Sequence, residues 1–138
     1  MVTSTLFIKT LINSRLTKRR KNLEKLAMKA KLRSAFENEM QLARKEYDSQ
    51  HYSTCFEHLE RAHILGQRNY ITHVRNHYWM YKVAVRVGDT RETLGQIVRI
   101  IMSIGSLIGV VPKGNTGRAR ISPIKPMKMP RDLQVYFD

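Results

Sequence analysis

Residues 54–84 read TCFEHLERAHILGQRNYITHVRNHYWMYKVA, and this stretch decides the fold. Its first half carries an apolar stripe at helical spacing, formed by Cys55, Leu59 and Ala62. Gly66 is a favoured residue at the end of a helix, and Asn69 is a favoured residue at the start of the next one. A second stripe follows on one helix face: Tyr70, Val74, His77, Tyr81 and Ala84. The sequence therefore predicts two antiparallel helices joined by a short turn.

One further helix is predicted on each side of this pair. Before it, an apolar stripe is formed by Phe36, Met40, Ala43 and Tyr47. After it, the most regular stripe of the chain is formed by Leu94, Ile97, Val98 and Ile101. The pairs Thr54 with Glu57 and Asp89 with Glu92 have the spacing of capping boxes at helix starts. We therefore expect an all-α fold built from two antiparallel helical hairpins.

The order of large and small apolar residues in these hairpins is similar to that of tetratricopeptide repeats. The pattern recurs more loosely after about 38 residues, close to the repeat length of that class, although the Trp and the closing proline of the consensus are absent. The helical domain is predicted to cover residues 33–111. Residues 112–138 contain all 4 prolines of the chain, so we expect them to form an irregular Pro/Gly-containing tail that packs on the helices.

Positive charge is concentrated at the start of the chain. The net charge is +14, and residues 1–33 hold ten Lys or Arg against the single acid Glu24, so ten minus one leaves +9 in this segment. Residues 1–32 are therefore predicted to be a basic extension, disordered or partly helical. Three interpretations stay open: a dispensable or organelle-targeting extension, an over-long gene start, and an arm, residues 9–33, that contacts nucleic acid or anionic lipid.

Two features bear on the compartment. The single cysteine, Cys55, rules out an internal disulfide and fits a reducing environment. The longest apolar stretch, residues 100–111, is too short to cross a bilayer. We therefore expect a cytoplasmic protein without a transmembrane segment.

A group of histidines is the feature of the sequence that most suggests chemistry. His73 and His77 are four residues apart on the third helix, the spacing by which one helix offers two ligands to a metal. The turn at 66–69 brings His63 opposite His73, and Glu60 precedes His63 by three residues, as in di-metal helical bundles. These four residues are the predicted metal ligands, for Zn²⁺ or, with further oxygen ligands such as Glu92, for Fe²⁺ or Mn²⁺. The alternative is that the histidines only form hydrogen bonds inside the core.

Two other groups are candidate binding sites. Lys113, Gly114, Asn115, Thr116 and Gly117 could form an anion-binding turn, because two glycines can orient successive backbone N–H groups inward. The alternative is a tight turn that fixes the tail on the helices. Tyr70, Tyr78 and Trp79 form an aromatic group on the third helix that could face a partner, although core packing is the usual role of such residues. No catalytic residue is predicted.

Four segments together resemble one protein family. They are Leu59–Gln67, His73-x-x-x-His77, Glu92-x-x-Gly-Gln96 and Pro112-x-Gly-Asn-Thr-Gly117, and they are similar to a small bacterial family catalogued as domain of unknown function 3703. The resemblance covers roughly residues 33–133 and implies no activity.

Three functions are therefore weighed. The leading one is a non-enzymatic binding or scaffold module with a protein or peptide partner, with a homodimer as one way to complete its short groove. The first alternative is a metal-binding protein that uses the His/Glu cluster. The second is contact with nucleic acid or an anionic membrane through the basic arm.

Overall fold

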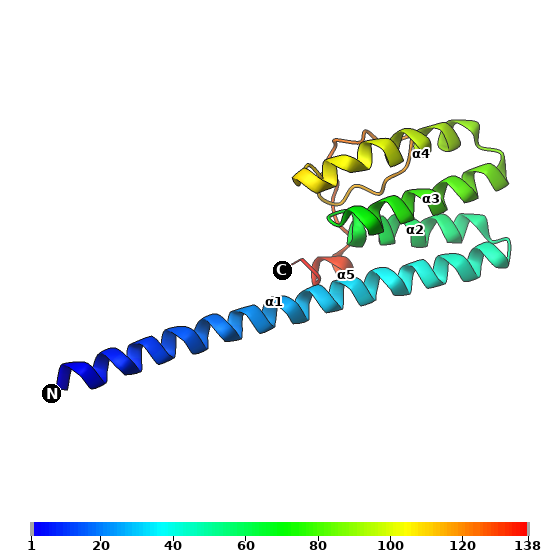
Figure 1. Cartoon of the computed structure of the whole chain (residues 1–138). Coiled ribbons are helices and arrows are strands. Elements are labelled where there is room, and N and C mark those ends of the chain that lie inside the picture. Colours follow the sequence, from blue (N-terminus) through cyan, green and yellow to red (C-terminus); the bar gives the residue numbers. More distant parts are fainter. Residues whose placement is uncertain (1, 138) are drawn as a thin grey trace. The chain divides into compact units, whose positions relative to one another are not determined.

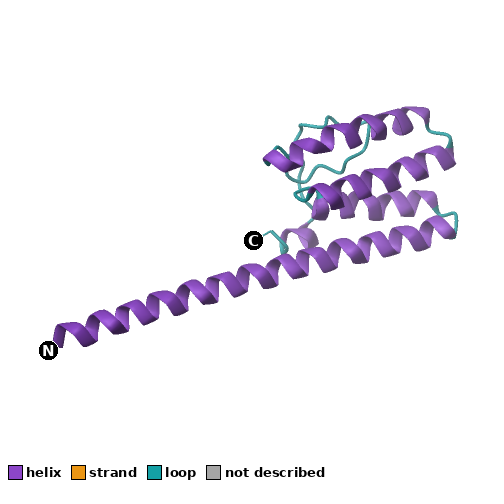
Figure 2. Cartoon of the chain, viewed as in Figure 1, coloured by secondary structure: helices purple, strands orange, loops and turns teal. Residues whose placement is uncertain are grey.

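The computed structural model describes the backbone of residues 2–137 and the side chains of residues 13–137, and within these bounds the fold is all-α, as predicted. Its elements are α1 (Val2–Asp48), α2 (Tyr52–Gly66), α3 (Tyr70–Val87), α4 (Thr90–Met102), the 3₁₀ helix η1 (Ser103–Ile108) and α5 (Arg131–Gln134). Figure 1 traces this order along the chain. Figure 2 shows short loops between the first four helices and a long irregular segment after η1.

The chain divides into two compact units, Met1–Lys31 and Leu32–Asp138. In the first unit the backbone is helical from Val2 onward, and every described side chain from residue 13 to 31 is exposed. Eight of these 19 side chains are Lys or Arg, and Arg20 forms a surface ion pair with Glu24 at 3.0 Å. The second unit holds all the buried residues among those whose side chains are described.

The core of the second unit is where the sequence predicts it for the first two helices. Phe36, Met40 and Ala43 are buried on α1, as is the α2 stripe of Cys55, Leu59 and Ala62. On α3 the buried apolar residues are Met80, Val83 and Ala84. The two-hairpin packing is therefore confirmed, whereas the likeness to tetratricopeptide repeats stays a prediction.

Helix boundaries follow the predicted signals only in part. Asn69 caps α3, because its side chain accepts hydrogen bonds from the backbone N–H groups of Ile71 and Thr72, and Gly88 ends α3 in the left-handed conformation. The capping box at Thr54 is wrong, since α2 already begins at Tyr52. Asp89 does cap α4 through the N–H of Glu92, whereas the Glu92 side chain bonds elsewhere.

Gly66 lies at the end of α2, as predicted, but without the left-handed backbone that glycine often adopts there. It is the last residue of α2 and does not have a positive φ. A Cβ atom at this position would lie 2.6 Å from the Phe36 ring. The glycine therefore allows the start of the α2–α3 turn to approach α1 closely.

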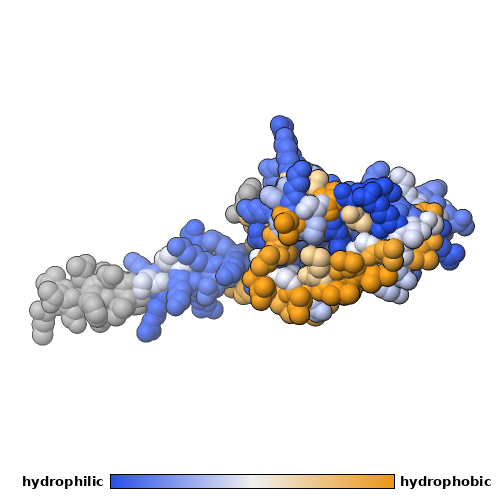
Figure 3. Space-filling model, turned by 90° about the horizontal axis from the view of Figure 1, so that it is seen from above, coloured by the Kyte–Doolittle hydropathy of each residue, from blue (hydrophilic) through white to orange (hydrophobic). Residues whose placement is uncertain are grey.

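Helix α4 does not bury the regular apolar stripe that its sequence carries. Its regular apolar stripe lies in solvent, with Leu94, Ile97, Val98 and Ile101 between 42% and 71% exposed, while its buried residues are Glu92, Gln96 and Arg99. Figure 3 shows apolar surface gathered on the side of the molecule that is seen from above. The reason is the tail: its irregular backbone has polar groups that need partners, and the polar face of α4 supplies them.

The tail is fixed by these backbone contacts. Gln96 donates to Gly117 O at 3.0 Å, Ala119 N donates to Glu92 at 3.0 Å, and Arg99 donates to Arg118 O at 2.7 Å. No helix forms between Pro112 and Pro130, as predicted, but the short helix α5 after Pro130 was not predicted. It inserts Leu133 into the core at 2% exposure.

None of the helices in the described part of the chain has a stretch long and apolar enough to cross a membrane.

Removal of residues 1–31 is expected to leave the helical body intact. Every buried residue with a described side chain lies at or after Phe36, so the midpoint of thermal unfolding of residues 32–138 should match that of the full chain within about 2 °C. Circular dichroism during heating measures this. A fall of more than about 5 °C, which corresponds to roughly 1 kcal/mol in a domain of this size, would contradict the division into two units.

Candidate metal centre

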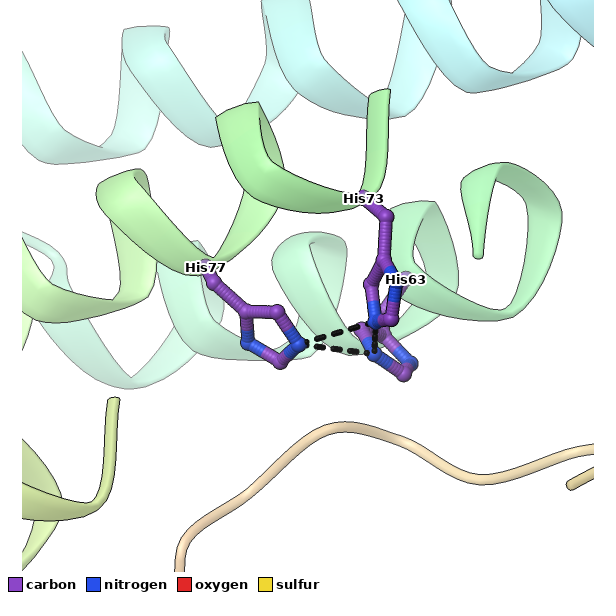
Figure 4. A group of neighbouring side chains, drawn as sticks. All are labelled: His63, His73 and His77. Carbon is purple, nitrogen blue, oxygen red and sulfur yellow. Dashed lines mark hydrogen bonds between the residues drawn. The ribbon is translucent and has the colours of Figure 1, made fainter. Parts of the chain in front are cut away.

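The turn between α2 and α3 brings three histidines together. His63 lies on the last turn of α2, and His73 and His77 lie one turn apart at the start of α3 (Figure 4). Thr72 strengthens the turn, because its hydroxyl donates to Gly66 O at 2.6 Å. The predicted juxtaposition of the three imidazoles is therefore present in the structure.

The three rings face one point through the same kind of atom. The Nε2 atom of His63 lies 3.0 Å from Nε2 of His73 and 3.2 Å from Nε2 of His77, and the remaining pair is 3.0 Å apart. All three side chains are buried, with exposed fractions of 3%, 8% and 1% in chain order. Among the described residues these histidines form the one group whose ligand atoms are close enough to hold a single ion.

Hydrogen bonds on the outer side of two rings determine their tautomers. His63 Nδ1 donates to the backbone oxygen of Asn115 at 2.6 Å, and His77 Nδ1 donates to Gln96 Oε1 at 2.7 Å. The Gln96 amide nitrogen donates to Glu92 and to Gly117 O, so its oxygen is left for His77. Because an oxygen acceptor requires the hydrogen on Nδ1, both Nε2 atoms carry a lone pair that points into the cluster.

The environment keeps these rings neutral. Burial lowers the pKa of His73 to about 4 and that of His77 to about 3, and it lowers the pKa of His63 well below its usual value. The positive charge of Arg99 acts in the same direction on all three pKa values. Neutral imidazole is the form that binds metals.

The tail closes the cluster from one side. Gly117 has a φ of 80°, and a Cβ atom there would lie 2.6 Å from the His63 ring. Its N–H donates to the side chain of Asn115, whose amide nitrogen donates to the backbone oxygens of Ser122 and Lys125. The turn at 113–117 thus holds the tail together and places the Asn115 carbonyl against His63.

The other side of the cluster opens into a cavity of about 560 Å³. Its lining includes the three histidines, Gln67 and Arg99. Most of the remaining wall is apolar, formed by Met102, Ile108, Val110, Val111, Pro112, Pro123, Ile124 and Pro126. Gln67 Oε1 is buried in this wall without a hydrogen-bond partner among the described residues.

Neither predicted carboxylate joins the histidines. Glu60 lies 3.3 Å from the Arg118 guanidinium, and burial raises the pKa of its carboxyl group. Glu92 accepts hydrogen bonds from Gln96 and from Ala119 N. Both carboxylates therefore belong to the contacts that fix the tail, outside the group of ligand atoms.

The aromatic residues of α3 are divided between surface and core. Tyr70 and Tyr78 are exposed, whereas Trp79 is half-buried and packs edge-on against Tyr47 with ring centroids 5.6 Å apart. Lys82 lies over the indole ring at 4.1 Å from its centroid. The three residues therefore do not share one exposed face.

Sequence reasoning missed several residues that surround the rings. Gln96, Arg99 and Gln67 were not predicted as site residues. Asn115 contacts the cluster through its backbone oxygen, and the anion-binding role of the turn at 113–117 stays a prediction. One signal was available: the four segments that carry the family resemblance include His63 and Gln67, the His73–His77 pair, Gln96 and Asn115. The structure brings all four segments to this cluster.

Comparison with known proteins identifies the family. The family described as "Protein of unknown function (DUF3703)" matches residues 30–137, so the chain belongs to it. No curated protein and no solved structure matches the chain.

The buried neutral histidines predict how stability depends on pH in the metal-free protein. In the unfolded chain an imidazole has a pKa of about 6.5, whereas the folded pKa values of His73 and His77 are about 4 and about 3. The unfolded chain therefore binds more protons between these values, so stability is complete above about pH 6.5 and falls as the pH decreases. Each histidine should contribute a slope approaching about 1.4 kcal/mol per pH unit.

Denaturant unfolding of chelator-treated protein between about pH 7 and about pH 5 measures this slope. The double variant His73→Ala/His77→Ala serves as the comparison and should lose most of it. Equal slopes in the two proteins would show that these histidines are not buried in the neutral form.

Proposed function

We propose that this protein binds one divalent transition metal ion, with Zn²⁺ as the best match, through the Nε2 atoms of His63, His73 and His77. The observation that carries the proposal is the convergence of these three atoms at 3.0–3.2 Å from one another. Nitrogen ligands at about 2.0–2.1 Å from a tetrahedral zinc lie roughly 3.3 Å apart. A small outward shift of the rings would therefore accommodate the ion.

Hydrogen bonding alone accounts poorly for the same geometry. His63 and His77 both have their hydrogen on Nδ1, so His73 is the one ring of the three that could place a hydrogen on Nε2. One hydrogen cannot serve three short contacts, and the 3.2 Å contact between His63 and His77 opposes two lone pairs. A buried acceptor without a partner costs about 1–3 kcal/mol, and a bound cation removes this cost.

The outer contacts also have the form expected around a metal. Histidine ligands commonly donate their second N–H to a carbonyl or carboxylate oxygen, which orients the ring and increases its basicity. His63 and His77 do so through Asn115 and Gln96. Because Glu60 and Glu92 are engaged elsewhere, the ligand set is made of nitrogen, which favours Zn²⁺ over the oxygen-preferring Mn²⁺.

Three protein ligands leave a fourth coordination position. In zinc proteins a closed set of four protein ligands is typical of structural sites, while three ligands and an open position are typical of sites that act on a bound molecule. The cavity beside the histidines gives that position room. The exposed apolar face of α4 does not identify an occupant, so the binding-module function stays a prediction from the sequence.

Metal titration of the full-length protein, prepared without a histidine tag and freed of metal by a chelator, tests the proposal. We expect one Zn²⁺ or Co²⁺ per chain, with the visible spectrum of tetrahedral Co²⁺. His73→Ala/His77→Ala should weaken binding at least about 100-fold, since two of the three ligands are lost. Circular dichroism of each variant checks that the helices are retained.

Two variants sharpen the result. His51→Ala removes an exposed imidazole ring that bonds to the Glu46 carboxylate and should leave the metal affinity unchanged. Gln96→Met removes the acceptor that orients His77 and should lower affinity by about 10–100-fold. Absence of stoichiometric binding in the wild-type chain, or equal binding by the double histidine variant, would refute the proposed site.

A further inference from the structure

We infer that the open position of the metal centre binds a small monocarboxylate with an aliphatic body, whose negative charge faces Arg99 and the metal and whose alkyl part occupies the apolar end of the cavity. The inference rests on the proposed metal site and adds the class of molecule that this site accepts.

The first observation is the charge of the cavity wall. Arg99 is the one charged side chain among its lining residues, and the lining contains no Asp or Glu. The three ligands are neutral imidazoles, so a divalent ion would add two positive charges to a wall that already holds one. Burial of uncompensated charge is costly, and an anion at the fourth position supplies the compensation.

The second observation is the way Arg99 is held. Its side chain is 8% exposed, and its Nη2 atom donates to the backbone oxygens of Arg118 and Ile121. Among the described residues no carboxylate lies within ion-pair distance of it, and no group accepts a hydrogen bond from its Nε or Nη1 atoms. The guanidinium is therefore fixed in place by the tail with donors left over, which is the arrangement that recognises a carboxylate.

The nearby carboxylates do not neutralise this charge by contact. Glu92 lies 3.4 Å from Arg118, and Glu60 lies 3.3 Å from the same guanidinium. Both are absent from the cavity lining. The two acids thus balance the charge of Arg118 by contact, and Glu92 acts on the charge of Arg99 at a distance. The charge of a metal ion would remain without a partner inside the cavity.

The third observation is the composition of the remaining wall. Beyond the histidines, Gln67, Arg99, Ser103 and Asn115, the lining consists of Met, Ile, Val, Pro and Gly residues. The hydroxyl of Ser103 already donates its one hydrogen to Arg99 O and so has none left for an anion. A hydrated ion such as phosphate gains nothing from these apolar side chains, whereas an aliphatic carboxylate presents one polar end to the metal and one apolar end to them.

Spectroscopy of the Co²⁺-loaded full-length protein tests this inference. Butyrate, acetate, phosphate and the neutral amide butyramide are titrated separately while the visible bands of Co²⁺ are recorded. Butyrate should change the spectrum in a saturable way at a concentration at least about tenfold lower than acetate, because its extra methylene groups are buried. Phosphate should bind more weakly than butyrate, and butyramide should have no effect.

Variants of two arginines on α4 locate the effect. At a Co²⁺ concentration that saturates each variant, Arg99→Met should raise the dissociation constant of butyrate at least about tenfold, and Arg99→Lys should restore part of the loss because it keeps the charge. Arg91→Met is the matched control, since Arg91 is exposed on the same helix and does not line the cavity. It should bind butyrate as the wild type does.

The outcomes separate the two proposals. A protein that fails to bind Co²⁺ would overturn both. Co²⁺ binding with a spectrum indifferent to butyrate, or equal responses to butyrate and butyramide, would overturn this inference alone. Tighter binding of phosphate than of butyrate would also overturn it, because the apolar wall would then have no role. The comparison of butyrate with butyramide uses the wild-type chain and so stands even if the Arg99 variants do not fold.

Discussion

The opposition of two imidazole lone pairs is the constraint on which the rest of this structure depends. His63 and His77 both donate through Nδ1, so their Nε2 atoms meet at 3.2 Å with no hydrogen between them. Such an arrangement is unfavourable unless a cation lies between the rings. The protein nevertheless builds it from three separate parts of the chain: the α2–α3 hairpin, the buried side of α4 and the turn at 113–117.

A second constraint, the polar backbone of the tail, explains why α4 is oriented against its apolar pattern. An irregular tail cannot satisfy its own backbone polar groups, and a tail packed on an apolar helix face would leave them buried and unpaired. Glu92, Gln96 and Arg99 meet those groups, and Gln96 at the same time orients His77. As a consequence, the apolar stripe of α4 from Leu94 to Ile101 is exposed to solvent. The tail also forms part of the cavity wall, and its backbone holds the guanidinium of Arg99.

Local patterns in the sequence predicted the hairpins and the three histidines because both depend on short spacings. Phe36, Met40, Cys55 and Leu59 are buried where a helical period places them, and a four-residue spacing puts His73 beside His77. The direction that α4 faces could not be predicted in this way, because it depends on contacts with the tail. In one of these contacts Gln96 bonds to Gly117, which lies more than 20 residues further along the chain. Glu60 was predicted as a ligand from its spacing to His63, but Arg118, 58 residues away, holds its carboxylate. Gly66 and Gly117 are needed for close contacts with Phe36 and His63, which no local pattern reveals.

The central claim is that three histidines of this family member form one metal site that is open to a cavity. A crystal structure of the protein grown with Zn²⁺, with diffraction data on both sides of the zinc absorption edge, tests it most directly. The account predicts one anomalous peak, about 2.0–2.1 Å from each of the three Nε2 atoms, with a fourth position that faces the cavity. A peak elsewhere, or none within bonding distance of His63, His73 and His77, would contradict it.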